Sequence, residues 1–230
     1  MAGKFMRGAF VQFVETFLLP LPNVIAFQFN PESISHAWAP AQATQSDDDN
    51  PLAVNGPPGE SFDFTLAMDA SDMIADGSPV AQALATTNGI YTRIAALEML
   101  LQPTGGGGGL LGSVSLSASG LSIGSGVKRP IPAAQLPTVL FVWGPGRIVP
   151  VKVNSLSITE TLYDPLLLSP THAEARVGLQ VLTPRELQHV SGPLAEVARV
   201  AYTYSKTLRQ GLAIANLANA TESIIGMLPN

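Results

Sequence analysis

Two stretches of the chain alternate between apolar and polar residues. The apolar positions of one parity are Phe62, Phe64, Leu66 and Met68 in the first stretch and Ala175, Val177, Leu179 and Val181 in the second. Because successive side chains of a strand point to opposite faces, each stretch is predicted to be a strand with one buried face. The alternation changes parity within residues 149–159, and one extra residue near Asn154 and Ser155, a β-bulge, explains the change.

Shorter strands are predicted in three further parts of the chain, at residues 4–17, 24–29 and 137–143. The chain does not alternate between strands and helices, as a parallel sheet would require. We therefore expect a predominantly antiparallel sheet with a few helices, which is a fold that is mainly β with α.

Helical periodicity appears in the middle of the chain and again near residue 183. One apolar stripe at helical spacing runs through Ile90, Ile94, Leu97 and Leu101. Asn88 is predicted to cap this helix, and Pro103 with the glycines after it is predicted to end it. Residues 183–186, Thr-Pro-Arg-Glu, match a capping box with proline at the first helical position, so a short helix is predicted to begin there.

A longer helix is predicted from Pro193 toward Leu228. One stripe comprises Leu194, Val197, Ala201, Leu208, Leu212 and Ala215, and a second comprises Ile214, Leu217, Ile224 and Leu228. The change of stripe predicts a bend or a division near Gly211. An apolar stripe of this length cannot remain bare in water, so the helix is expected to pack on its own sheet or on a neighbouring subunit.

Two segments lack periodicity and are predicted to be loops, at residues 39–59 and 103–132. The first contains the run Asp47, Asp48 and Asp49, and the second is a Gly/Ser tract with consecutive glycines from Gly105 to Gly109. Fixing each residue of such a tract costs about 1–2 kcal/mol of backbone entropy. We therefore expect residues 103–132 to become ordered only against a partner surface.

Low charge is the main feature of the composition. Charged residues make up 13% of the 230 residues, and the mean hydropathy is +0.26. So little charge predicts an obligate oligomer whose subunits cover each other's apolar surface. Direct membrane insertion is not expected, because no stretch reaches the about 20 apolar residues of a spanning helix. Nucleic acid is not an expected partner either, because the net charge is −5.

One motif suggests catalysis. Residues 120–124, Gly-Leu-Ser-Ile-Gly, match the nucleophile elbow of serine hydrolases. The remaining members of a triad follow in hydrolase order, as Asp164 and then His172 or His189. An elbow requires a helix after the serine, and Pro130 prevents one there. A serine hydrolase that uses Ser122 is therefore the weaker alternative.

No catalytic, cofactor or metal site is predicted. The chain has no cysteine, which removes thiolate nucleophiles and Cys-ligated zinc. The acidic run at residues 47–49 lacks the spacing and the glycine of an EF-hand. The three histidines, His36, His172 and His189, show no i, i+4 pairing. Trp38 and Trp143 are interpreted as packing residues.

The segment at residues 27–34, Phe-Gln-Phe-Asn-Pro-Glu-Ser-Ile, resembles the opening of a known domain. This is the tube-protein domain of contractile injection systems of the antifeeding-prophage and virulence-cassette types. A second region is similar to a longer passage of the family, which contains the patterns F-x-W-G, S-L-x-I-x-E-x-F-D-P and P-x-x-A-x-V-x-L in this order. The matching blocks of this chain are residues 139–144, 151–160, 163–165 and 169–182. Tyr163 replaces the frequent Phe, and residues 171–175 replace a more basic stretch. The predicted helix at residues 89–101 also resembles a helix of this family.

The resemblance covers blocks within residues 5–182 and carries implications for the fold. It implies an antiparallel β-barrel or sandwich of the phage-tail-tube type at residues 1–182, with the two loops as insertions, and a C-terminal helical extension at residues 183–230. Family members often carry a C-terminal LysM-type domain, and no such domain is recognised here. Its absence argues against a peptidoglycan-binding role.

The function that the resemblance implies is structural and non-enzymatic. The chain would form a homo-hexameric ring that joins the inner tube to the spike hub and baseplate and initiates tube assembly. The implied partners are further copies of itself, the spike or hub protein, the inner tube protein and the baseplate wedge proteins. The implied location is the bacterial cytoplasm, in a phage-tail-like protein-translocation particle that is either retained or released. The alternative within this class is an ordinary inner-tube or tail-completion subunit.

The turn at residues 163–165 is predicted to be a structural device. Tyr163 is expected to be anchored in apolar packing. On that expectation, replacing Tyr163 with alanine would cost several kcal/mol.

Overall fold

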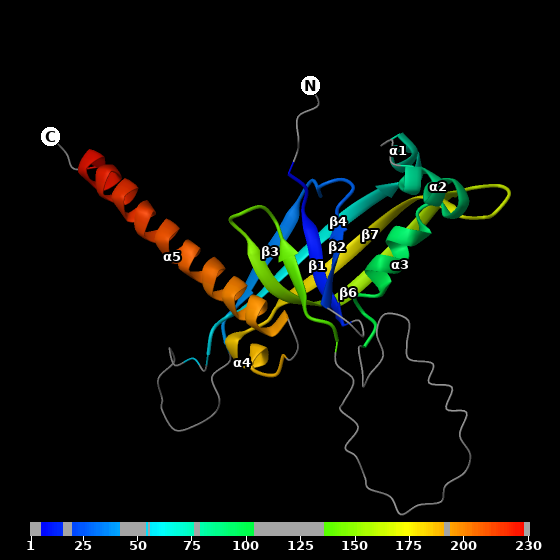
Figure 1. Ribbon diagram of the computed structural model, residues 1–230. Helices are drawn as coiled ribbons and strands as arrows, with labels where there is room; N and C mark the ends of the chain where they lie inside the picture. Colours follow the sequence, from blue (N-terminus) through cyan, green and yellow to red (C-terminus); the bar gives the residue numbers. More distant parts are fainter. Residues whose placement is uncertain are drawn as a thin grey trace, which may run out of the picture.

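The computed structural model describes residues 6–15, 20–41, 54, 56–75, 79–103, 136–190 and 194–227. Its strands are β1 (Ala9–Glu15), β2 (Pro20–Ala26), β3 (Ile34–Ala39), β4 (Gly59–Asp69), β5 (Val139–Val142), β6 (Ile148–Tyr163) and β7 (Pro170–Val181). Its helices are α1 (Ala70–Ala75), α2 (Pro79–Asn88), α3 (Tyr91–Glu98), α4 (Pro184–Leu187) and α5 (Leu194–Met227). Figure 1 shows a curved sheet with α1, α2 and α3 toward one end and α4 and α5 toward the other.

The described strands form one seven-stranded sheet in the order β2-β1-β5-β6-β7-β4-β3. Every neighbouring pair is antiparallel. Within the described ranges the edge strands β2 and β3 do not pair with each other, so the sheet is open. The expectation of an antiparallel sheet with several helices is confirmed. β3 is an addition to the predicted strands.

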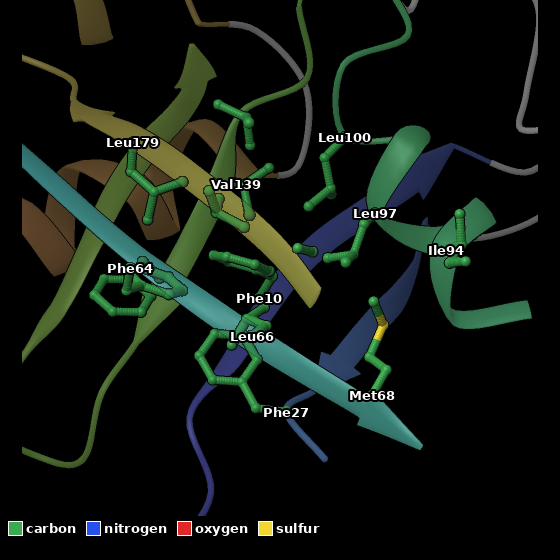
Figure 2. Close-up of a cluster of buried hydrophobic side chains, with 14 of the residues drawn as sticks. Phe10, Phe27, Phe64, Leu66, Met68, Ile94, Leu97, Leu100, Val139 and Leu179 are labelled. Carbon is green, nitrogen blue, oxygen red and sulfur yellow. The ribbon is translucent and has the colours of Figure 1, made fainter. Parts of the chain in front are cut away.

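A cluster of aromatic side chains shows how strongly the sheet curls. Phe10 on β1 and Phe64 on β4 have ring centroids 6.2 Å apart, although β5, β6 and β7 lie between their strands. Figure 2 shows these rings with Phe27, Leu66 and Val139 on the concave side of the sheet. The apolar residues of β4 and β7 face this side, so the predicted alternation is confirmed.

The predicted β-bulge is also confirmed. The pairing of β6 with β7 changes register between Val153 and Ser155. The bulge lets β6 keep its apolar side chains on the concave side before and after the change, because Leu156 and Ile158 also pack against the core.

The helical segment before β5 differs from its prediction at the beginning. Asn88 is the last residue of α2, an unpredicted helix, and does not cap α3. The N-cap of α3 is Ile90, which makes no side-chain capping hydrogen bond. Ile94 and Leu97 of α3 face the aromatic core, as the stripe predicts (Figure 2).

Gly89 permits the tight turn between α2 and α3. Its φ is +56°, and an added Cβ would collide with the carbonyl oxygen of Pro170, which already accepts a hydrogen bond from Ile90 N–H at 3.0 Å. Gly89→Ala is therefore expected to lower the free energy of unfolding by about 1–3 kcal/mol. The measurement is urea unfolding beside Gly146→Ala, because a Cβ at Gly146 meets no atom within 4 Å. Equal midpoints for the two variants would contradict this account.

The short helix α4 begins with the predicted capping box. The Thr183 hydroxyl accepts from Glu186 N–H, and the Glu186 carboxylate accepts from Thr183 N–H at 2.9 Å. Burial raises the pKa of Glu186, but hydrogen bonds from Thr183 and the nearby Lys152 ammonium outweigh it, so this pKa lies below its ordinary value. The box fixes the chain direction just before α5.

α5 is a single helix that continues through Gly211, so the predicted division there is wrong. Its buried face matches the predicted stripe in part. Leu194 and Ala201 are buried as predicted, but Val197 is exposed, and Ala198 and Ser205 are buried although they lie outside the stripe. The Ser205 hydroxyl donates to the Ile148 carbonyl at 2.6 Å, which holds the helix close to the start of β6. Small residues form this face because the helix lies close against the strands.

Candidate assembly surfaces

The β6–β7 hairpin ends in a tip whose large side chains are exposed and apolar. The exposed members are Leu162, Tyr163, Leu166, Leu167 and Leu168. The tip is nevertheless well ordered, since the Asp164 carboxylate accepts from the backbone N–H groups of Leu166 and Leu167 at 2.9 Å each. Two leucines at the base of the tip, Leu162 and Leu168, have positive φ. These hydrogen bonds and backbone angles fix the conformation of the turn. A fixed turn that exposes several leucines to solvent is typical of a surface that contacts another molecule.

The prediction that Tyr163 is anchored in apolar packing is wrong. Its side chain is 52% exposed, and its hydroxyl donates to the Glu160 carbonyl at 3.5 Å. Tyr163 pairs with Pro170 at the outer end of the hairpin, beyond the curled part of the sheet. A large stability cost for Tyr163→Ala is therefore no longer expected in the isolated chain.

The other end of the sheet carries a pocket of about 350 Å³ beneath α5. Its walls include Trp38, Pro58, Leu182, Tyr202 and Lys206. The pocket lies where β3 and β7 end and where β4 and β6 begin, as the pairs Trp38–Glu60 and Val151–Val181 require. Tyr202 is half-buried there, and burial followed by the charge of Glu60 raises its pKa.

A buried carboxylate holds α5 at this pocket. Glu60 is 5% exposed and accepts from the Arg209 guanidinium through both oxygens, at 2.8 and 2.5 Å. His36 Nε2 lies 2.9 Å from Glu60 Oε1, and the Arg209 guanidinium lies 5.0 Å above the Trp38 ring. Both carboxylate oxygens are therefore engaged in ion pairing and hydrogen bonding, which suits a structural clamp more than acid–base chemistry.

Sequence reasoning missed this cluster, although a signal for it is present. Glu60 has the same parity in its strand as Phe62 and Phe64, which face the core. A charged residue at an inward position needs a buried partner. That partner lies far along the chain, on α5, so the pattern within β4 does not identify it.

The residues of the hydrolase alternative are only partly described. Ser122 lies outside the described residues, as does the acidic run at residues 47–49. Asp164 is engaged in the hairpin turn, and His172 Nδ1 lies 3.4 Å from the carboxylate of Asp69. His189 lies in the turn after α4, where its backbone N–H donates to the Glu186 carbonyl. The side chains of Asp164 and His172 are therefore held by different partners, and none of these contacts joins the three residues to one another.

Two further surfaces are available for contact with other chains. Beyond Gln210, α5 extends away from the sheet (Figure 1), and Leu212, Ile214 and Leu217 on it are exposed. The edge strands β2 and β3 each pair on one side only within the described sheet. Unpaired strand edges and exposed apolar helices both favour association.

No protein-family model matches the sequence, and no curated protein sequence matches it. The described helices include none that is long and apolar enough to cross a membrane. Among the same described residues, no group of three or more His, Cys, Asp or Glu side chains is placed to hold a metal ion.

Proposed function

We propose that the chain is a structural subunit of a contractile injection system. In this proposal it forms a ring at the junction of the inner tube with the spike hub and baseplate, and it initiates the tube. The observation that carries the proposal is the amount of ordered apolar surface that one copy leaves exposed. The hairpin tip, residues 211–217 of α5 and the edge of β3 at Trp38 are all exposed to solvent in the single chain.

The fold is compatible with the phage-tail-tube type that the resemblance implies. An antiparallel sheet that curls over one aromatic core, with α3 packed against that core, supports this finer assignment. The motif at residues 27–34 also has a structural role that fits. The Asn30 side-chain carbonyl accepts from Gly8 N–H at 2.9 Å, and its amide donates to the Met6 carbonyl at 3.0 Å. The asparagine thus ties the N-terminal segment to the turn between β2 and β3.

The open edges of the sheet support assembly by strand pairing. Neighbouring copies can pair β2 and β3 across their edges, which satisfies the free backbone groups and extends the sheet around a ring. The partners in this proposal are further copies of the chain, the spike or hub protein, the inner tube protein and baseplate wedge proteins. The proposed cellular location is the bacterial cytoplasm, within the assembling particle.

The test is the assembly state of the purified chain. Light scattering after size-exclusion chromatography should give a discrete species of about six times the 24.0 kDa chain mass, and negative-stain images should show rings. Long tubes would favour the alternative of an ordinary inner-tube subunit. A stable monomer at high concentration would contradict the ring.

A further inference from the structure

The hairpin tip and the pocket under α5 lie at opposite ends of the same two strands. Val149 and Val181 line the pocket, whereas Tyr163 pairs with Pro170 at the tip. β6 alone has 16 residues, and at roughly 3.3 Å per residue its ends lie about 50 Å apart. The tip of one copy therefore cannot reach its own pocket. Any contact between these two features joins different copies.

The tip and the pocket both present apolar surface to solvent. Leu166 is 89% exposed at the outermost part of the tip, and Leu167 beside it is also exposed. The pocket, at about 350 Å³, lies within the range of about 300–1,000 Å³ that is usual for binding cavities. Trp38, Pro58 and Leu182 give it apolar walls. Aliphatic side chains that enter an apolar pocket are the usual centre of a protein interface.

The charges around the two features also match. Glu160 and Asp164 place negative charge beside the leucines of the tip. At the pocket, Glu60 and Arg209 neutralise each other, and Lys206 adds positive charge. Opposite charges around an apolar contact orient the approach of two chains. The same acidic residues would repel an anionic lipid surface, which favours a protein as the occupant.

We infer that the tip of one copy inserts Leu166 and Leu167 into the pocket under α5 of a second copy. Such a contact is head-to-tail, because it joins two different surfaces of the same chain. Head-to-tail contacts produce closed rings when the rotation per step closes, and open filaments otherwise. The inference rests on the proposed self-assembly and adds a second contact to the pairing of sheet edges, one that joins copies displaced along the strand direction.

The absence of cysteine from the chain allows a direct crosslinking test. One variant carries Leu167→Cys at the tip, and a second, of different tagged length, carries Gln210→Cys at the pocket. A disulfide needs two Cα atoms within roughly 4.4–6.8 Å of each other, and insertion of the tip into the pocket brings Leu167 of one copy beside Gln210 of another. Oxidation of the mixture should then give a mixed dimer about tenfold or more above the yield with Val80→Cys in place of Leu167→Cys. Val80 is a matched control, because it is similarly exposed but lies on α2.

The outcomes separate this inference from the proposed function. Rings of the wild-type chain with a mixed dimer no higher than the control would overturn the tip contact alone. A wild-type chain that stays monomeric would overturn both. The double variant Leu166→Ser/Leu167→Ser, checked for folding by circular dichroism, should lose the larger assemblies that the tip contact builds and keep the association that strand-edge pairing provides. If it instead loses only co-sedimentation with phosphatidylcholine vesicles and still assembles, the tip is a lipid contact and the inference is wrong.

Discussion

Phe141→Ala is expected to produce the largest loss of stability among single substitutions in the core. Phe141 is fully buried on β5, in the middle of the curled sheet. Its ring centroid lies 5.4 Å from those of Phe62 and Phe64 and 6.0 Å from that of Phe10. Removing it leaves a cavity that the surrounding strands cannot close. We expect a loss of about 3–5 kcal/mol in the free energy of unfolding.

The measurement is chemical denaturation of the variant in parallel with Phe29→Ala. Phe29 is a phenylalanine of the same chain whose side chain is substantially exposed, so its removal should change the unfolding free energy by about 1 kcal/mol or less. Phe141→Leu should fall between the two, because leucine refills part of the space. If Phe141→Ala and Phe29→Ala cost the same, the aromatic cluster is not the centre of the core.

Local patterns predicted the central strands well. The period of two in β4 and β7 follows directly from burial on one face, and the change of parity in β6 corresponds to a real bulge between Val153 and Ser155. The capping box of α4 is likewise a local arrangement of four consecutive residues. Such features are predictable because the residues that cause them lie next to one another in the sequence.

Features that depend on distant contacts were predicted less well. α2 contains mostly Ala, Gln and Thr and has little apolar periodicity, so its helical state was not expected. Most of the buried face of α5 consists of small residues because the sheet lies close to it, and the predicted stripe of apolar residues included the exposed Val197 and omitted the buried Ala198 and Ser205. Tyr163 was expected to be buried because it is aromatic, but no described element packs over the hairpin tip.

The ion pair between Glu60 and Arg209 gives the second large expected effect. Arg209→Met retains much of the apolar length of the arginine and removes the charge that both Glu60 oxygens bind. Glu60 then stays buried with His36 as its remaining described partner. Breaking a fully buried pair costs about 3–5 kcal/mol. Because the Arg209 side chain is 35% exposed, solvent screening reduces the expected loss to about 2 kcal/mol.

The readouts are urea unfolding and hydrogen exchange along α5. We expect exchange to rise in residues 202–217, where Arg209 attaches the helix to the sheet, and to rise less in α3. Arg199→Met is the matched control on the same helix. Arg199 pairs with Glu196, which is largely exposed, and also donates to the Leu187 carbonyl at 3.4 Å. The loss of an exposed pair and one long hydrogen bond should change stability by about 1 kcal/mol or less. Equal effects of Arg199→Met and Arg209→Met would show that the Glu60 pair does not hold α5.

A double variant separates the buried charge from the packing around it. Glu60→Gln/Arg209→Met removes the uncompensated carboxylate and keeps a side chain of similar size in the strand. If burial of a lone charge causes the loss in Arg209→Met, the double variant should recover about half or more of it, and the two substitutions should be strongly non-additive. If the loss arises from packing of Arg209 over Trp38, the double variant should be no more stable than Arg209→Met. Recovery of stability while α5 still exchanges faster than in the unsubstituted chain is the result that the clamp requires, because the double variant removes the buried lone charge but does not restore the Arg209–Glu60 link between the helix and β4.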